Sequence, residues 1–304
     1  MYLETMYSSY ENPNHYSHPL VTIITPTYNS NSVYLRNAIQ SVLSQTYLHV
    51  EYIIIDDGSN NFPETEVKEL LSSKKSETFT WKILRQEQNI GTVKNMNYAV
   101  KVANGKYIVG LAHDDSFYDE SVISDLVREF QNSNALLITA QKKDWDPLLK
   151  KEGEITPTKE KIQYLREFPP KVLYGSLLED NFVYGASTAY STECFMKYGF
   201  FDEKYRYLED WPYVLKLSRR GVGIHFWNRI VIRYSVRGIS THPTNIRFMK
   251  EDLRCRREHL LYFLLHPLSG YAINSRQYLS FLKHALKNYL YRAKTLMKAQ
   301  SSRK

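Results

Sequence analysis

Two kinds of hydrophobic pattern alternate along the first 140 residues. Short, continuous apolar runs that stop at Pro, Gly or Asp are typical of buried parallel strands, and they predict strands at 20–25, 50–55, 80–84, 106–111 and 135–140. Between them, apolar residues recur at helical spacing and predict helices at 32–46, 64–71, 92–103 and 120–132. Strands that alternate with helices over short connections indicate the α/β class: a doubly wound, mostly parallel sheet with helices on both faces.

The pattern changes after residue 140. Residues 142–170 are charged and contain four prolines, so we expect an irregular surface segment with one helix at 159–167. Regular periods then return and predict strands at 188–191, 222–226 and 230–236 and helices at 194–198 and 210–220. The remaining apolar residues follow a helical period at 244–265 and 275–299. The chain therefore divides into a polar N-terminal tail (1–18), an α/β domain (19–240) and a helical C-terminal extension (241–304).

Charge is distributed unevenly over the 304 residues. The net charge is +8, which would suit a nucleic acid, a membrane surface or an anionic substrate. Residues 219–304 contain 18 Lys and Arg and three acids, so that segment has a net charge of +15 and the preceding part −7. The basic character belongs to the C-terminal third.

Cysteine content and hydropathy indicate the compartment. The two cysteines, Cys194 and Cys255, have no paired spacing, so neither a disulfide framework nor a zinc site is indicated. The N-terminus has no basic start followed by an apolar run, and no stretch approaches the ~20 apolar residues of a spanning helix. We expect a cytoplasmic protein, with a peripheral position on the inner face of the plasma membrane as an option.

Polar residues follow three of the predicted strands: Thr27, Tyr28 and Asn29; Asp56 and Asp57; Asp114 and Asp115. Carboxyl ends of parallel strands share one edge of a sheet, where ligands bind. Adjacent carboxylates raise each other's proton affinity, so a divalent metal with a diphosphate would suit Asp114 and Asp115. The alternatives are a helix cap at Asp114–Asp115 and an Asx turn at Asp56–Asp57. No GxGxxG follows the first strand, which argues against a dinucleotide-binding fold.

Several motifs occur in a set order between residues 20 and 240. They are TPTYN, IIIDDGS, NIGTVKNMN, GLAHDDS, YLEDW and YSVRGIS. In this order and spacing they resemble those of family 2 glycosyltransferases, which have the GT-A fold, invert configuration and use nucleotide-sugar donors.

The resemblance implies a donor site. Its predicted residues are Pro26, Thr27, Tyr28, Asn29, Asp56, Asp57, Gly91, Asn97 and Arg237. A carboxylate there can accept a base N–H or a ribose hydroxyl, and a guanidinium can hold a diphosphate bidentately. Arg237 stands where the family usually has His.

The resemblance also implies a metal site at Asp114 and Asp115, in place of the family's D-x-D-D cluster. The first acid of that cluster is replaced by Ala112. Oxygen ligands and diphosphate oxygens imply Mg2+ or Mn2+ as the cofactor.

The implied catalytic residues are Glu209 and Asp210, with Asp210 as the base that deprotonates the acceptor hydroxyl. At a helix N-terminus, Asp210 is expected to keep a low proton affinity. The alternative is a simple N-cap, which nothing in the local sequence excludes.

Apolar residues trace one face of the predicted C-terminal helix, and lysines and arginines lie off it. Such a helix can lie on an anionic membrane, pack on the catalytic domain or pair with a second copy in a homodimer.

We therefore predict an enzyme that transfers a sugar from a nucleotide diphosphate sugar, with a lean towards UDP-sugars, to a glycan or lipid-linked acceptor in cell-surface polysaccharide synthesis. The alternative is a non-catalytic nucleotide-sugar-binding protein of the same fold, which Ala112 and Arg237 motivate. A nucleotidyltransferase would need a glycine-rich basic loop after the first strand, and TPTYNSNS has none. Nucleic acid is not an expected partner, because it would leave the donor-site motifs unexplained.

Overall fold

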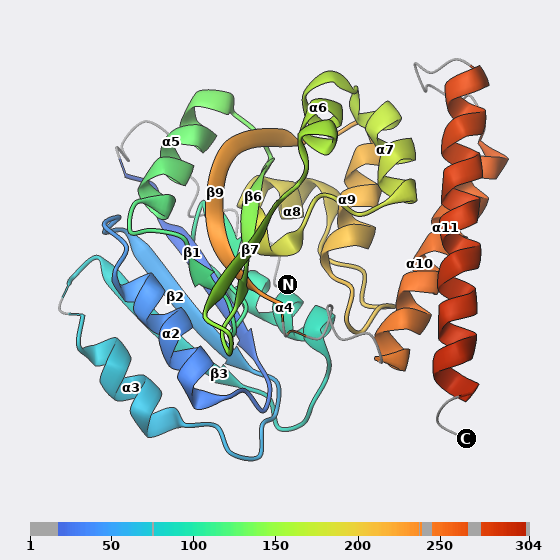
Figure 1. Cartoon of the computed structure of the whole chain (residues 1–304). Helices are drawn as coiled ribbons and strands as arrows, with labels where there is room; N and C mark the ends of the chain where they lie inside the picture. Colours follow the sequence, from blue (N-terminus) through green and yellow to red (C-terminus); the bar gives the residue numbers. More distant parts are fainter. Residues whose placement is uncertain (1–17, 75, 237, 239–244, 267–274, 302–304) are drawn as a thin grey trace, which may run out of the picture.

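A nine-stranded sheet forms the centre of the computed structural model, which describes residues 18–74, 76–236, 238, 245–266 and 275–301 (Figure 1). Its strand order is β3-β2-β1-β4-β8-β6-β9-β5, and β7 pairs with β6. The strands are β1 (Val21–Thr27), β2 (Val50–Asp56), β3 (Phe79–Arg85), β4 (Tyr107–Gly110), β5 (Ser116–Phe117), β6 (Leu137–Asp146), β7 (Lys151–Thr156), β8 (Thr188–Ser191) and β9 (His225–Ser235).

Helices cover both faces of the sheet, as the α/β pattern predicts (Figure 1). One face packs against α2 (Ser32–Leu43), α3 (Glu64–Ser72) and α5 (Val122–Ser133). The core on the other face is formed with α4 (Thr92–Val102), α6 (Lys159–Glu167), α7 (Pro170–Glu179), α8 (Thr192–Tyr198), α9 (Asp210–Arg219) and α10 (Ile246–Leu265). α11 (Ser275–Ser301) packs outside this layer, on α7 and α10. Successive residues of β2 serve the two cores in turn: Tyr52 and Ile54 one, Ile53 and Ile55 the other. This explains why the strand is apolar throughout.

Parallel pairing is continuous in only one half of the sheet. β1 pairs in parallel with β2 and β4, and β2 with β3. Thr27 lies opposite Asp56, and Ile24 lies opposite Gly110, so the carboxyl ends of these strands share one edge as predicted. Beyond β4 the sheet is mixed: β8 is antiparallel to β4 and β6, whereas β9 is parallel to β6. The predicted class is confirmed, but the mostly parallel character belongs to the first half.

Two local predictions in the second half are wrong, and one helix was not predicted. The charged segment after residue 142 is not irregular, because β6 continues to Asp146 and forms a hairpin with β7. α7 was not predicted. The two strands expected at 222–226 and 230–236 are one strongly curved strand, β9, because register shifts against β6 absorb the polar residues between Phe226 and Ile230 (Figure 1).

The two C-terminal helices pack on the domain and on each other (Figure 1). On α11, Ala285 is buried, the Tyr278 hydroxyl donates to the Phe263 carbonyl (3.1 Å), and the Asn288 side chain donates to the Glu179 carbonyl at the end of α7. These contacts support the packing alternative. None of the described helices is both long and apolar enough to cross a membrane.

Candidate active site

The loops after β1 and β2 are joined by hydrogen bonds. The Asp57 amide donates to the Thr27 carbonyl (2.9 Å), and the Asn29 amide donates to Ser59 Oγ (2.7 Å). Asn29 has a φ of 45°, a left-handed conformation that Asn tolerates. Tyr28 between them is 45% exposed. The turn thus presents one aromatic ring at the sheet edge and uses its neighbours to hold the loop.

Asp56 is fully buried, and its own loop supplies hydrogen bonds to both carboxylate oxygens. Ser59 donates through its amide (3.0 Å) and its hydroxyl, and Arg85 Nε lies 3.4 Å from Oδ2. The local turn that was the alternative interpretation of this motif is therefore present. A donor contact by Asp56 remains a prediction.

Asp57 connects the second loop to the segment before α4. Its two oxygens accept from the amides of Ile90 (2.7 Å) and Gly91 (2.9 Å). Burial raises the pKa of this carboxyl, and the two hydrogen bonds partly oppose the shift. Gly91 has a φ of 94°, and a Cβ there would lie 2.4 Å from Arg206 Cγ, so this site requires glycine.

Arg206 is a site residue that the sequence analysis missed. Its guanidinium donates to the carbonyls of Asn89 (2.9 Å) and Ile90 (3.3 Å), and its charge lies close enough to Asp57 to lower that carboxyl's pKa. Its carbonyl accepts from the Val93 amide. The available signal was a single basic residue in the YRYLED run, next to the expected catalytic acids.

Asn97 is not brought to this edge. It is 1% exposed, its amide nitrogen donates to the Phe201 carbonyl (2.9 Å), and its amide oxygen accepts from the Phe201 amide (3.1 Å). Asn97 therefore holds the loop after α8 through both hydrogen bonds to Phe201.

Asp114 and Asp115 lie between β4 and β5. They do not cap the next helix, because α5 begins at Val122 behind Ser121. Asp115 is 4% exposed; its Oδ1 accepts from the Ser235 amide (2.8 Å), and its Oδ2 accepts no hydrogen bond from any described residue. Burial and, next, the charge of Asp114 raise the pKa of Asp115 well above its ordinary value.

This pair fits a metal site of the Mg2+ type. Among the described residues, no group of three His, Cys, Asp or Glu side chains could hold a metal. Mg2+ commonly takes only one or two carboxylates and completes its shell with substrate phosphates and water. The buried, unpaired oxygen of Asp115 beside Asp114 is suited to such a cation. Arg237, predicted to hold the diphosphate, lies outside the described residues, although its neighbour Gly238 approaches Asp114.

Lys142 is a second residue that the sequence analysis missed. It is 6% exposed, pairs with Asp144 Oδ1 (2.6 Å), and its ammonium lies 3.8 Å from the Tyr234 ring centre and 4.9 Å from that of Tyr184. Its positive charge partly opposes the rise in the pKa of Asp115. No pattern in the sequence marks Lys142, because it lies in the segment that was expected to be irregular.

Asp210 is held from two sides. Its Oδ2 accepts from the Gly185 amide (2.9 Å) and its Oδ1 from the Trp211 amide (2.6 Å). A Cβ on Gly185 would lie 2.8 Å from Asp210 Cβ. The predicted low proton affinity is wrong: burial raises the pKa of Asp210, and these hydrogen bonds oppose the shift only in part. Burial and, next, the charge of Asp210 raise the pKa of Glu209 to about 8.

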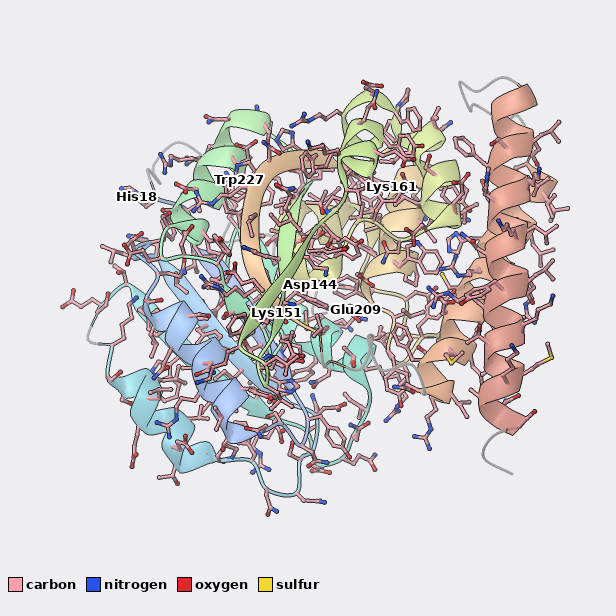
Figure 2. The ribbon with its side chains drawn as sticks, viewed as in Figure 1. His18, Asp144, Lys151, Lys161, Glu209 and Trp227 are labelled. Carbon is pink, nitrogen blue, oxygen red and sulfur yellow. The ribbon has the colours of Figure 1, made fainter. Side chains whose placement is uncertain are left out.

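Lys142 connects the Asp114–Asp115 pair with the Glu209–Asp210 pair through two tyrosines. Tyr234 adjoins Ser235, whose amide donates to Asp115. Tyr184 adjoins Gly185, whose amide donates to Asp210. Figure 2 shows Asp144, the ion-pair partner of Lys142, and Glu209 near the middle of the molecule. The tertiary structure thus joins two motifs that are far apart in the sequence.

The fold and the acidic edge of the sheet are together typical of transferases of the GT-A class. Residues 22–188, more than half of the chain, match the model of glycosyl transferase family 2. The chain belongs to this family and is a glycosyltransferase. It is 28% identical over 240 residues to an uncharacterized glycosyltransferase of Rickettsia typhi, covering 78% of this chain and 70% of that protein. An uncharacterized glycosyltransferase of Haemophilus influenzae is 25% identical over 254 residues, covering 81% and 75%.

Solved structures confirm the fold. The crystal structure of Staphylococcus aureus TarS in complex with UDP-GlcNAc has a TM-score of 0.62 at 18% identity, over 88% of this chain and 71% of that one. The mannosyltransferase PcManGT from Pyrobaculum calidifontis, in complex with GDP-Man and Mn2+, has a TM-score of 0.63 at 15% identity, over 94% and 75%.

Proposed function

We propose that this protein is an inverting, metal-dependent glycosyltransferase that moves a sugar from a UDP-sugar to a hydroxyl of a glycan or lipid-linked acceptor in cell-surface polysaccharide synthesis. The observation that carries the proposal is the buried oxygen of Asp115 that accepts no hydrogen bond from any described residue. Lys142 links this acid to Asp210 through Tyr234 and Tyr184, which adjoin the residues that donate to the two acids. An enzyme that stabilises a departing diphosphate and deprotonates an acceptor needs those two functions close together.

The donor's nucleoside is proposed to bind at the edge formed by the loops after β1 and β2. Exposed Tyr28 offers a ring face to the base, and Pro26, Thr27 and Asn29 shape the turn. Asp57, with Asp56 behind it, keeps the loop at Gly91 in place. The complexes of similar structures with UDP-GlcNAc and GDP-Man support a nucleotide-sugar donor and leave the choice of base to experiment.

Mg2+ or Mn2+ is proposed to bind at Asp114 and Asp115. A cation held there with the diphosphate would supply Lewis acidity and would neutralise charge on the leaving group. Arg237 is proposed to hold the diphosphate as well. The positive charge of Lys142 offsets part of the negative charge of Asp115.

Asp210 is proposed to take the proton of the acceptor hydroxyl. The hydroxyl oxygen attacks the anomeric carbon on the face opposite the diphosphate, the bond to the diphosphate breaks, and configuration inverts. A raised pKa makes Asp210 a stronger base than an exposed Asp, which favours proton transfer near neutral pH. Glu209 places a second acid beside it, and the charge of Asp210 adds to the upward shift in the pKa of Glu209 that burial causes.

Incubation with UDP- and GDP-sugars, with and without Mn2+, tests the proposal. Thermal stabilisation by UDP that requires Mn2+, together with sugar transfer to an acceptor, is the expected result. Metal-dependent binding with no transfer or hydrolysis of any donor would favour the non-catalytic alternative. The same measurements on GDP decide the base.

The exposed face of α11 supports a peripheral membrane position for the protein. Leu279, Leu286, Leu290 and Met297 are 45–61% exposed and recur at helical spacing, among several lysines. An apolar stripe flanked by cations suits an anionic bilayer surface. Sedimentation with anionic vesicles should fall when Leu286 and Leu290 are both changed to Ser; unchanged sedimentation would leave these helices a packing role only.

A further inference from the structure

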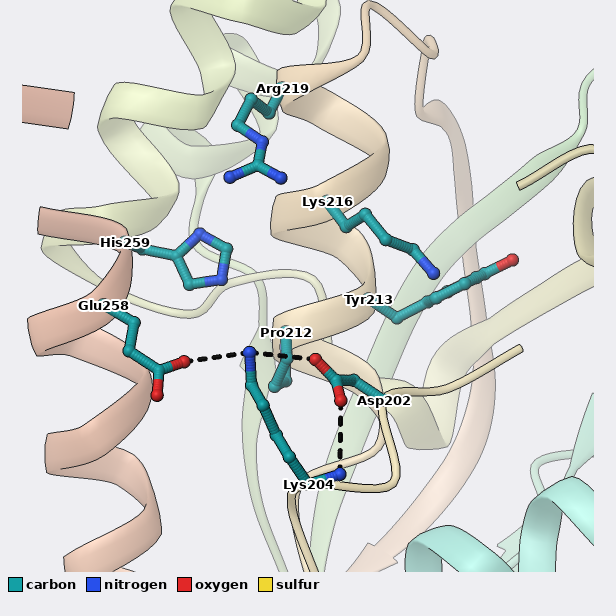
Figure 3. Close-up of a pocket in the computed structure, with 8 residues that line it drawn as sticks. All are labelled: Asp202, Lys204, Pro212, Tyr213, Lys216, Arg219, Glu258 and His259. Atoms are coloured by element: carbon teal, nitrogen blue, oxygen red, sulfur yellow. Dashed lines mark hydrogen bonds and ion pairs between the residues drawn. The ribbon is translucent and has the colours of Figure 1, made fainter. Parts of the chain in front are cut away.

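A pocket of about 120 Å3 lies between α9 and α10, on residues that the proposed reaction does not use (Figure 3). Its volume is several times the ~10–15 Å3 that a single water needs. Eight residues line it: Asp202, Lys204, Pro212, Tyr213, Lys216, Arg219, Glu258 and His259. Six of these eight side chains are ionisable acids, bases or imidazole, so charge decides what the pocket accepts.

The two acids of the pocket are already neutralised by the protein. Lys204 Nζ lies 2.9 Å from both Asp202 Oδ2 and Glu258 Oε2 (Figure 3). Glu258 also accepts from Arg254 Nε (2.9 Å) and the Tyr205 hydroxyl (2.9 Å), and its pKa falls to about 2, with Lys204 the largest lowering influence against the opposing effect of burial. Neither acid is free to balance the other cations.

Neither Lys216 nor Arg219 forms an ion pair with a described acid, although the charge of Asp202 partly opposes the fall in the pKa of Lys216. Lys216 donates to the Phe200 carbonyl (3.1 Å) and lies over the Tyr213 ring, and neither partner has a negative charge. Arg219 stacks on the Tyr262 ring at 4.1 Å and forms no hydrogen bond or ion pair with any described residue. The pocket therefore contains two cations without an ion-pair partner among the described residues, both at the C-terminal end of α9.

Mutual repulsion of these groups is visible in their proton affinities. Burial and, next, the charges of Arg220 and Arg219 lower the pKa of Lys216 to about 8. Burial and, next, Arg219 and Lys204 lower the pKa of His259 to about 4, so its ring is neutral near pH 7. Half-buried, unpaired cations are costly, and an anion between them would remove that cost.

We propose that this pocket is a binding site for a phosphate group, either inorganic phosphate or a phosphate monoester, held by Lys216 and Arg219. Arg supplies the forked donor that phosphate oxygens prefer, and Lys supplies a point charge. The site is distinct from the donor site, because its residues lie on α9, α10 and the 202–204 loop and none is an Asp114, Asp210 or Gly91 contact.

Occupancy of this pocket is linked to the active-site loop. Glu251 on α10 accepts from the amides of Arg206 (2.8 Å) and Tyr207 (2.8 Å), and Arg206 in turn holds the Asn89 carbonyl. An anion that joins α9 to α10 therefore stabilises the packing that positions this loop. The inference does not rest on the proposed sugar transfer.

Thermal unfolding in inorganic phosphate, with EDTA and without nucleotide, tests the site. At about ten times the dissociation constant, the melting temperature of the parent should rise by roughly 2–4 °C. Each variant is compared with its own phosphate-free sample. Lys216→Gln plus Arg219→Gln should lose the rise; Arg219→Lys alone, which keeps the charge, should retain part of it.

Two variants serve as matched controls. Lys287→Gln removes an exposed cation of α11 and should respond to phosphate like the parent. Asp114→Ala should also respond like the parent, since its predicted defect concerns nucleotide and metal. An equal rise in the parent and the double variant reports only the general stabilisation that excluded salts produce, and it overturns the proposal.

Vesicles distinguish a lipid headgroup from a soluble phosphate as the natural source. Phosphatidylcholine vesicles are compared with vesicles that also contain phosphatidic acid. If the double variant loses both the phosphate response and sedimentation with phosphatidic acid, the headgroup is the ligand. If it loses only the phosphate response, the ligand is a soluble phosphate ester.

Discussion

Two pairs of adjacent carboxylates at the same edge of the sheet are treated in opposite ways. The loops around Asp56 and Asp57 donate hydrogen bonds to all four oxygens of that pair. Asp115, equally buried, keeps one oxygen without a donor and has a strongly raised pKa. The loops satisfy the first pair completely, whereas the second keeps a buried oxygen that the proposed cation would contact.

Asp210, in the third pair of adjacent acids, resembles Asp57 more than Asp115. Hydrogen bonds from Gly185 and Trp211 fix where Asp210 lies, but its pKa is still raised. The lesson is that similar motifs, two acids after a strand or before a helix, differ in how far the protein satisfies them. A raised pKa alone does not mark the acids expected to perform chemistry, because the pKa of Asp57 is raised as well; the distinguishing feature of Asp115 is its oxygen without a donor.

The largest effect on the transfer rate is expected when Asp210, the proposed base, can no longer take a proton. Asp210→Asn keeps an oxygen for the Gly185 amide but cannot take a proton, so kcat should fall by about 10²–10⁴-fold. UDP binding with Mn2+, measured by calorimetry, should stay near the parent value. A variant within tenfold of the parent rate would exclude Asp210 as the base.

The second-largest effect is expected from the loss of Asp114, one of the two proposed metal ligands. Asp114→Ala should lower transfer by at least about 100-fold, because a metal ion contributes several kcal/mol to transition-state stabilisation. Stabilisation by UDP with Mn2+ should disappear. The exposed Glu69→Ala variant is the control for loss of one negative charge. If Asp114→Ala binds UDP and Mn2+ as the parent does, the metal lies elsewhere.

Displacement of the base without removal of its carboxylate gives a smaller effect. In Gly185→Ala the new Cβ meets Asp210 Cβ at 2.8 Å, so the carboxylate must move and kcat should fall about tenfold or more. Gly223→Ala is the matched control, because its Cβ meets nothing within 4 Å. Equal rates for the two variants would show that the Gly185 contact does not position Asp210 for catalysis.

Asp57 should affect stability and donor affinity more than the chemical step. Asp57→Asn retains one acceptor for the two amides of Ile90 and Gly91, and the loss of a charged hydrogen bond should cost about 1.5–3 kcal/mol in the free energy of unfolding. Denaturant unfolding measures the loss, and KM for the donor should rise with it. A fall in kcat alone would place Asp57 among the catalytic acids.

The last prediction concerns pH. In the folded state the pKa of Glu209 is about 8, against an ordinary 4.5, so the folded protein holds a proton that the unfolded chain releases. Its contribution to stability is present below about pH 4.5 and is lost as pH rises through 8. Glu209→Gln should escape this loss, and its melting temperature relative to the parent should increase between pH 5 and 8. A constant difference would contradict the raised pKa.

Local periodicity was sufficient for the parallel half of the sheet. The strand predicted at 50–55 is β2 (Val50–Asp56), and the helix predicted at 64–71 is α3 (Glu64–Ser72). Both could be predicted because a strand buried on both faces and an amphipathic helix each have a characteristic hydrophobic pattern in the local sequence. The motif residues at the strand ends followed from the same pattern. Their placement at one edge is a consequence of parallel pairing, and the register of β1 with β2 and β4 confirms it.

The sequence by itself thus determined the α/β class, the acidic edge and the family. Tertiary structure alone decided the rest: the β6–β7 hairpin, Lys142 between two tyrosines, Arg206 against Asn89, and Gly185 against Asp210. The physical reason is that periodicity reports which face of an element is buried. Which distant groups become its neighbours, and how far they desolvate or satisfy a carboxylate, depends on how the elements pack in three dimensions.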